Sequence, residues 1–165
     1  MSVKDLLVEQ FTSCYDENSW FVALKNALSG VTAKEATWKP DNVENSIWEI
    51  VSHLNYYNYA YVERFKGVDY QYPVNDNDAT FVANKNATDE AWANEVAKLD
   101  VILTEFRELI RTADKDKFNQ PVSATNPAKW STLISNINTH NAHHGGQIVL
   151  LRKLQGSWDS SKGVS

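Results

Sequence analysis

The sequence predicts an all-α protein that folds as a four-helix bundle. Apolar residues recur at helical spacing through four stretches of the chain, and every proline falls between these stretches. The prolines are Pro40, Pro73, Pro121 and Pro127. We find no alternation of apolar and polar residues long enough for a β-strand. The chain has 165 residues, 42% of them hydrophobic, which suits one domain at residues 1–156 and a flexible C-terminal tail at 157–165.

The first expected helix runs from about Ser2 to Ser29, and Gly30 is its expected stop. The polar run at residues 16–19 marks a point at which this helix kinks or breaks.

The second expected helix runs from Ser46 to Lys66, just before Gly67. Ser46 and Glu49 have the spacing of a capping box, in which each side chain bonds the backbone of the other residue.

The third expected helix begins near Thr88, and its apolar positions alternate by threes and fours. These positions are Trp92, Val96, Leu99, Leu103, Phe106 and Ile110. The fourth helix begins between Pro127 and Ser131 and ends near Gln155, with Gly156 after it. The connections, about 15, 20 and 16 residues, are long for tight turns and indicate at least one crossover along the bundle.

Charge and cysteine content exclude several classes of protein. The net charge of −5 is interspersed, without the basic face that a nucleic acid or an anionic membrane would require. The single cysteine, Cys14, cannot form an internal disulfide, and no stretch resembles a signal peptide or a membrane span. We therefore expect a cytoplasmic protein without a nucleic-acid or membrane partner.

Three of the four histidines lie in one short segment at the fourth helix: His140, His143 and His144. Residues four apart lie on one helix face, with Cβ atoms ~6 Å apart, so His140 and His144 can grip one ion. On a helical projection His144 lies within the apolar stripe, His140 lies just inside its edge, and His143 points away. Asn141 stands where a zinc peptidase of the His-Glu-x-x-His type has its glutamate, which excludes that class.

A third metal ligand must come from elsewhere, and His53 is the remaining histidine. It lies at the rim of the apolar stripe of the second helix, a position suited to a metal that faces water. Three neutral imidazoles would leave coordination positions open, as in catalytic zinc sites. The competing interpretation is an ordinary, partly buried histidine.

Other candidates have equally ordinary explanations. Glu49 could act as a base or as a partner of His53, but its capping-box role already explains it. Tyr57, one turn after His53, could donate to a bound ligand or simply pack in the core. The adjacent Gly145 and Gly146 suit either close helix contact or space for a ligand.

The second helix carries an aromatic group on the side away from its main stripe: Trp48, Tyr56 and Tyr59. Exposed aromatic patches commonly mark contacts between chains, which would fit a homodimer. The alternative cover is the connection at residues 67–87, whose aromatic residues are Tyr70, Tyr72 and Phe81.

Two segments resemble the motifs of the DinB-like (YfiT-like) family. The segment from His140 to Arg152 resembles the family's last-helix motif, roughly His-x-x-x-His-x-Gly-Gln-Ile. The segment from Trp38 to Pro40, followed by Ser46 to His53, resembles its entry into the second helix.

The resemblance implies an up-down-down-up bundle with a long crossover between helices 2 and 3. It also implies one divalent ion, commonly zinc or nickel, on His53, His140 and His144, and a homodimer.

For function, the resemblance implies a metal-dependent thiol S-transferase that uses a low-molecular-weight thiol such as bacillithiol or mycothiol. The alternatives are a metal-dependent hydrolase of a small substrate and a non-catalytic stress protein that binds a metal or ligand. A missing general base would favour the thiol reaction, a glutamate beside the metal would favour hydrolysis, and a site filled by side chains would favour the non-catalytic protein.

Overall fold

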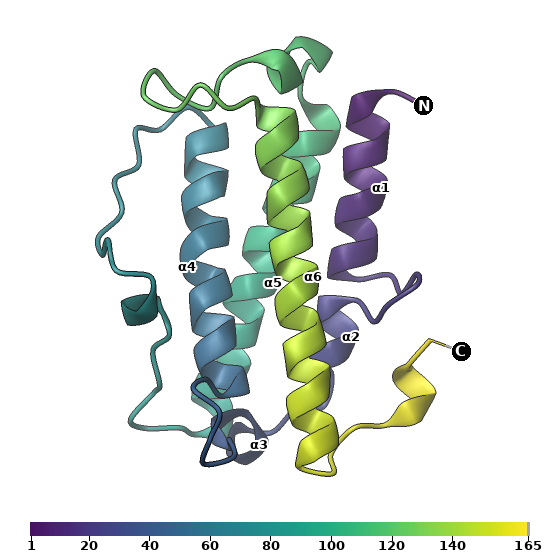
Figure 1. Ribbon diagram of the computed structural model, residues 1–165, viewed down its shortest axis with the longest axis vertical. Helices are drawn as coiled ribbons and strands as arrows, with labels where there is room; N and C mark the ends of the chain where they lie inside the picture. The colour runs from purple at the N-terminus through teal and green to yellow at the C-terminus, as the bar shows by residue number, and fades with distance from the viewer. Residues whose placement is uncertain (165) are drawn as a thin grey trace.

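The computed structural model describes residues 1–164, and within that range it contains helices and no β-strand. Four long helices form the bundle: α1 (Val3–Tyr15), α4 (Ile47–Phe65), α5 (Asp89–Thr112) and α6 (Trp130–Leu154) (Figure 1). The predicted all-α four-helix bundle is therefore confirmed.

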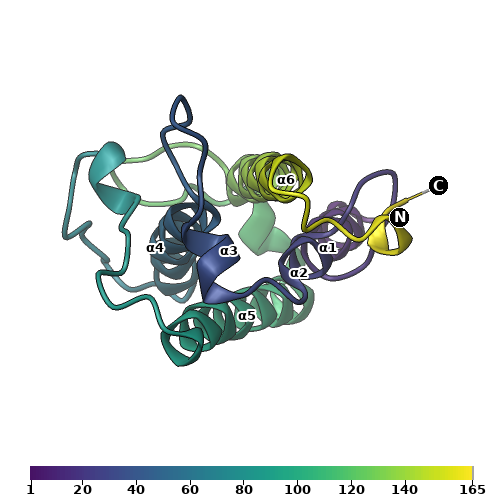
Figure 2. The ribbon, with the colours of Figure 1, turned by 90° about the horizontal axis from the view of Figure 1, so that it is seen from below.

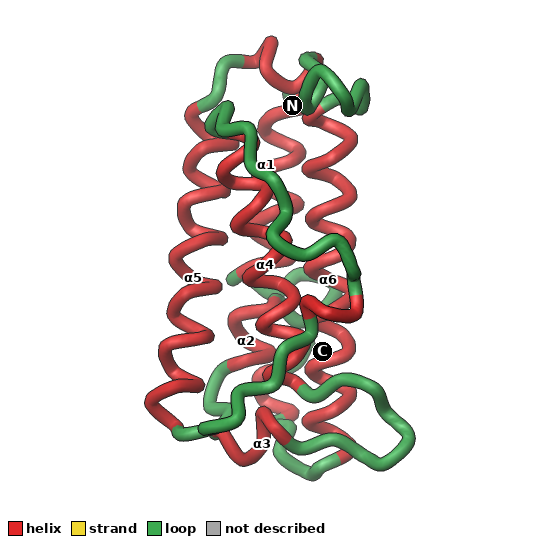
Figure 3. Tube along the Cα trace, turned by 90° about the vertical axis from the view of Figure 1, so that its left-hand side faces the viewer, coloured by secondary structure: helices red, strands yellow, loops and turns green. Residues whose placement is uncertain are grey.

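In Figure 1, α1 and α6 run downward, whereas α4 and α5 run upward. Because the neighbours α4 and α5 are parallel, the chain must travel the length of the bundle between them. The crossover at residues 67–88 does so outside α4, with one short 3-10 turn, η1 (Asp78–Thr80) (Figures 1 and 3). A second 3-10 turn, η2 (Lys115–Asn119), lies in the connection from α5 to α6.

The expected first helix is correct only as far as Tyr15. The chain then forms a loop, and a separate short helix, α2 (Leu24–Leu28), continues the same corner of the bundle. In the loop the Asn18 side-chain oxygen accepts from the Ala23 amide and the Asn26 side chain, both at 2.9 Å. Asparagine and aspartate side chains compete in this way with helical backbone bonds, which explains the break in the polar run.

A further short helix, α3 (Ala33–Thr37), was not expected from the sequence. Thr32 and Glu35 form its capping box, because each side chain bonds the other's backbone amide. Figure 2 shows α3 at the end of the bundle, beside α4 and α5.

The ends of the long helices follow the sequence closely. The Glu49 carboxylate accepts from the Ser46 amide at 2.7 Å, and the Ser46 hydroxyl accepts from the Glu49 amide at 3.3 Å, which confirms the expected capping box. The Thr88 hydroxyl caps α5. Gly156, two residues beyond Leu154 at the end of α6, has a φ of 77°, the left-handed conformation that favours glycine after a helix.

The core lies along the apolar seam of α5. Of the six seam residues named from the sequence, all are buried except Val96, which is half-buried. Phe106 packs edge-on against Phe11 of α1 and Phe65 of α4, so α5 joins two other helices of the bundle.

The aromatic group on α4 is largely covered within the chain. Trp48 is buried against Trp92 of α5, with ring centroids 5.1 Å apart. Tyr56 donates to the Val74 carbonyl of the crossover, and Tyr59, still 42% exposed, packs edge-on against Tyr70. Contacts with the crossover within the same chain therefore account for the packing of Tyr56 and Tyr59. The homodimer stays a prediction, because these residues give it no support.

The segment after α6, expected to be a flexible tail, contacts the body of the protein up to Lys162. The Arg152 guanidinium lies over the Trp158 ring, and the Lys162 carbonyl accepts from the Asn18 side chain. The Lys162 ammonium donates to the Ser29 carbonyl. Ser165, the last residue of the expected tail, lies outside the described residues.

Among residues 1–164, no helix combines the length and the hydropathy needed to cross a membrane.

Gly146 provides a test of the helical packing. It is exposed on α6, and a Cβ atom built there would meet no other atom within 4 Å. Replacing Gly146 by alanine should therefore raise the free energy of unfolding by about 1 kcal/mol, because alanine restricts the unfolded chain and favours the helix. Chemical denaturation measures this difference. A loss of stability would mean that the space beside Gly146 is filled in the folded protein.

Candidate metal centre

Three imidazoles from two helices converge at one point of the bundle. The Nε2 atom of His140, on α6, lies 3.0 Å from Nε2 of His53, on α4, and 3.1 Å from Nε2 of His144. The structure therefore brings together the three histidines named from the sequence. One ring nitrogen of each histidine lies within 4.8 Å of the corresponding nitrogens of the other two.

These distances fit a single divalent ion. Two nitrogens held ~2.0–2.1 Å from one ion, at angles of ~90–110°, lie ~2.8–3.4 Å from each other. The two measured Nε2–Nε2 distances fall inside that range. Because three protein ligands do not complete a tetrahedral or octahedral shell, a bound ion would keep positions for water or substrate.

The outer nitrogens of two of the rings are held by side-chain oxygens. Nδ1 of His144 lies 2.7 Å from Oε1 of Gln147, and Nδ1 of His53 lies 2.6 Å from the Thr80 hydroxyl. An amide oxygen accepts but cannot donate, so Nδ1 of His144 carries the proton and its Nε2 keeps a free lone pair. Gln147 is not among the candidate residues predicted from the sequence.

All three imidazoles are neutral at neutral pH. Burial, with the nearby His144 and His140, lowers the pKa of His53 to about 3. Burial and the neighbouring His140 lower the pKa of His144 to about 4, and burial and His143 lower the pKa of His140. Neutral imidazoles are the form that binds metal ions.

A reciprocal pair of amide hydrogen bonds joins α4 to α6 beside the histidines. The Asn58 side-chain nitrogen donates to Asn141 Oδ1, and the Asn141 nitrogen donates to Asn58 Oδ1, both at 3.0 Å. Both side chains are buried. Asn141 follows His140 directly in the chain. The Asn58–Asn141 pair therefore fixes the position along the axis of α4 at which His140 contacts that helix. The sequence indicated neither partner, because the pairing joins residues 83 positions apart.

Two aromatic rings flank the histidines. Phe81 of the crossover stacks on His53, with ring centroids 4.0 Å apart and planes 11° apart. The Tyr57 ring contacts the His53 ring edge-on, with centroids 4.9 Å apart, and its centroid lies 6.2 Å from that of the His140 ring. The expectation that the position of His53 faces water is wrong: the residue is only 2% exposed, because Phe81 and Thr80 of the crossover cover it.

The other sequence candidates lie apart from this cluster or serve structural roles. The Glu49 carboxylate accepts a hydrogen bond from the Ser46 amide in the capping box and forms an ion pair with Lys39. Burial raises its pKa, but the Ser46 and Lys39 hydrogen bonds outweigh burial and keep the pKa below the usual value. His143 is exposed and outside the group of three. Cys14 is buried, and burial raises its pKa to about 11, so its thiol is un-ionised at neutral pH.

The two glycines of α6 are not required by close packing. A Cβ atom at Gly145 would lie 3.9 Å from the Leu24 backbone, an ordinary contact, and Gly146 faces open space.

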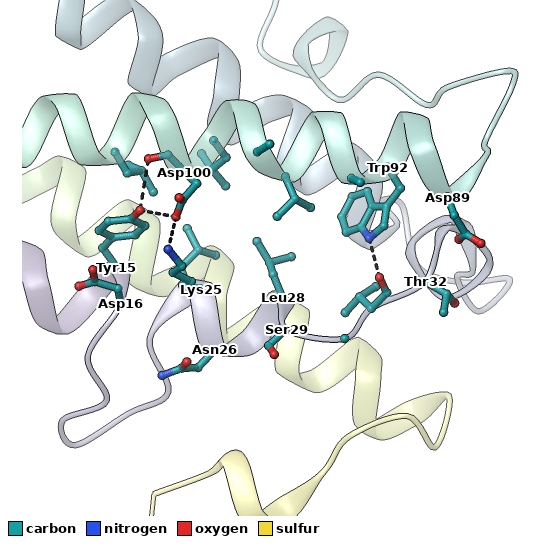
Figure 4. A pocket seen from close by; sticks show the side chains of 18 residues that line it. Tyr15, Asp16, Lys25, Asn26, Leu28, Ser29, Thr32, Asp89, Trp92 and Asp100 are labelled. Carbon is teal, nitrogen blue, oxygen red and sulfur yellow. Dashed lines mark hydrogen bonds and ion pairs between the residues drawn. The ribbon is translucent and has the colours of Figure 1, made fainter.

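A pocket of about 970 Å³ lies elsewhere, between α2 and α5 (Figure 4). Three of its polar groups are bonded to each other: Tyr15 and Lys25 both contact the Asp100 carboxylate. The Trp92 indole donates to the Val31 carbonyl at 2.7 Å. Because these groups are already satisfied, the histidine cluster remains the best-equipped site for chemistry.

Comparison with known proteins identifies the family of the chain. A family model described as the DinB superfamily matches residues 20–148, most of the chain. No curated protein and no solved structure matches the sequence significantly. The matched region contains all three histidines of the cluster, and the chain belongs to the DinB superfamily.

Proposed function

We propose that the protein binds one zinc or nickel ion through His53, His140 and His144 and transfers a low-molecular-weight thiol to an electrophile. The observation that carries this proposal is the convergence of three Nε2 atoms in a buried site whose histidines have no carboxylate partner among the described residues. Imidazole nitrogen suits both zinc and nickel.

When bound, the divalent ion would supply the chemistry that lowers the pKa of a thiol, so that the thiol could ionise near neutral pH. In the proposed reaction the thiol sulfur would form a bond to the electrophilic carbon, whose leaving group would depart with the bonding electrons, and the thiol proton would go to solvent. The protein's contribution would be to hold three neutral imidazoles around the ion and to leave its remaining coordination positions to the substrate.

Among residues 1–164, no carboxylate joins the three histidines as a general base, and this favours thiol transfer over hydrolysis. Metal-assisted hydrolysis commonly uses a carboxylate that orients and deprotonates the attacking water. Glu49, the sequence candidate for that role, is bonded to Ser46 and Lys39 instead. A thiol with a lowered pKa ionises without such a base.

Tyr57, whose ring contacts His53, is the candidate group for orienting a substrate. Burial, with the nearby Tyr72 and Tyr56, raises the pKa of its hydroxyl, which therefore keeps its proton at neutral pH. The hydroxyl now donates weakly to the Asn77 side chain at 3.3 Å, so it could turn to donate to an anionic substrate group.

A second candidate function is non-catalytic metal binding. Its support is the burial of His53 and His144 and the Phe81 ring stacked over His53, which narrow access to the ion. The two functions share the metal site and differ only in turnover.

The metal site is tested by single alanine substitutions. Replacing His53, His140 or His144 should lower the affinity for Zn²⁺ or Ni²⁺ at least tenfold, because each loses one of three ligands. His143→Ala is the matched control and should bind as the wild type does, since its ring is exposed outside the cluster. Titration against a chromophoric chelator measures these affinities. Binding of one ion per chain by a variant lacking both His53 and His140 would exclude the site.

Thiol transfer is tested with the metal-loaded protein, a panel of low-molecular-weight thiols and an alkylating electrophile. The wild type and His143→Ala should consume the thiol faster than the uncatalysed reaction, whereas His140→Ala should not. A loaded wild type that binds the ion but leaves the rate unchanged would contradict thiol transfer and favour non-catalytic binding. Cleavage of small esters or amides instead would favour a hydrolase.

A further inference from the structure

The crossover contributes a buried polar contact to the histidine cluster. Thr80, the last residue of η1, is 3% exposed, and its hydroxyl lies 2.6 Å from Nδ1 of His53. The same hydroxyl lies 2.6 Å from the Asn77 backbone carbonyl. The hydroxyl therefore links the crossover backbone to one candidate metal ligand.

The number of available protons determines which group donates in each hydrogen bond of the Thr80 hydroxyl. A threonine hydroxyl has a single hydrogen to donate, and a carbonyl can only accept. The hydrogen of Thr80 therefore points to Asn77, and toward His53 the hydroxyl accepts. It follows that Nδ1 of His53 carries the proton, and that Nε2, which faces His140, keeps its lone pair.

Phe81, the next residue, restrains the same ring in a second way. Its nearly parallel stack on His53 fixes the plane of the imidazole, and the Thr80 hydroxyl fixes the rotation within that plane. His144 obtains its outer hydrogen bond from Gln147 of its own helix, whereas His53 obtains it from a connection 27 residues further along the chain.

We infer that Thr80 is a positioning residue of the metal centre, and that residues 77–81 of the crossover form one wall of it. Thr80 holds His53 in the tautomer and orientation in which Nε2 can bind an ion, and Phe81 covers the outer face of that ring. The inference rests on the proposed metal site, but the state of His53 in the metal-free protein can be measured separately.

Valine is the informative replacement for Thr80, because it keeps the shape of the side chain and removes the oxygen. Thr80→Val should lower the affinity for Zn²⁺ or Ni²⁺ by about ten- to a hundredfold, the effect typical of losing a partner of a metal-bound histidine. Thr80→Ser keeps the hydroxyl and should restore affinity close to that of the wild type. Thr139→Val is the matched control: it removes an exposed hydroxyl next to His140 that bonds the Ser135 carbonyl of its own helix.

The readout that a purely structural role would not change is the tautomer of His53 in the metal-free protein, observed through its imidazole ¹⁵N resonances. We expect the Nδ1-protonated form in the wild type and in Thr80→Ser, and a mixture of tautomers in Thr80→Val. Equal metal affinity of Thr80→Val and the wild type would overturn the inference, as would equal losses in the valine and serine variants.

The tautomer of the wild type also decides the matter if Thr80→Val does not fold. A wild-type His53 protonated on Nε2 in the metal-free protein would overturn the role of Thr80. If the wild type has the Nδ1-protonated form but binds neither ion, the proposed function fails while the contact between Thr80 and His53 stands.

Discussion

The site depends on a reciprocal pair of hydrogen bonds between the buried amides of Asn58 and Asn141. Buried polar groups left without partners cost about 1–3 kcal/mol each, so sliding α4 along α6 would leave several such costs uncompensated. Apolar side chains alone would tolerate such a shift more easily, because their contacts are not directional. The amide pair therefore sets the register in which His53 meets His140 and His144.

The parallel arrangement of α4 and α5 is the second constraint, because it requires a connection as long as the bundle. That connection contacts Tyr56 and Tyr59 of α4 and places Thr80 and Phe81 against His53. A segment without regular structure thus becomes a wall of the site as a consequence of topology. Metal binding and the order of the crossover are expected to be coupled through Thr80.

Much of this architecture follows from the sequence. Helical periodicity and capping residues located α4, α5 and α6 closely, and the position of His144 within an apolar stripe selected it over His143. Local patterns could not show what distant segments contribute: the Asn58–Asn141 pair, the Thr80 contact and the burial of Trp48 against Trp92 all join residues far apart in sequence. For the end of α1, the sequence predicted a kink or a break at the polar run without distinguishing the two. The break results from the hydrogen bonds of the Asn18 side chain, which sequence patterns do not show.

The central claim is that the register of α4 and α6 places three imidazoles around one ion. X-ray absorption at the metal edge of the Zn²⁺- or Ni²⁺-loaded protein tests it most directly. The account predicts three imidazole nitrogens at ~2.0–2.1 Å, with lighter atoms such as oxygen in the remaining positions, and the loss of one imidazole in His53→Ala. A spectrum with fewer than three imidazoles, or one unchanged by His53→Ala, would contradict it.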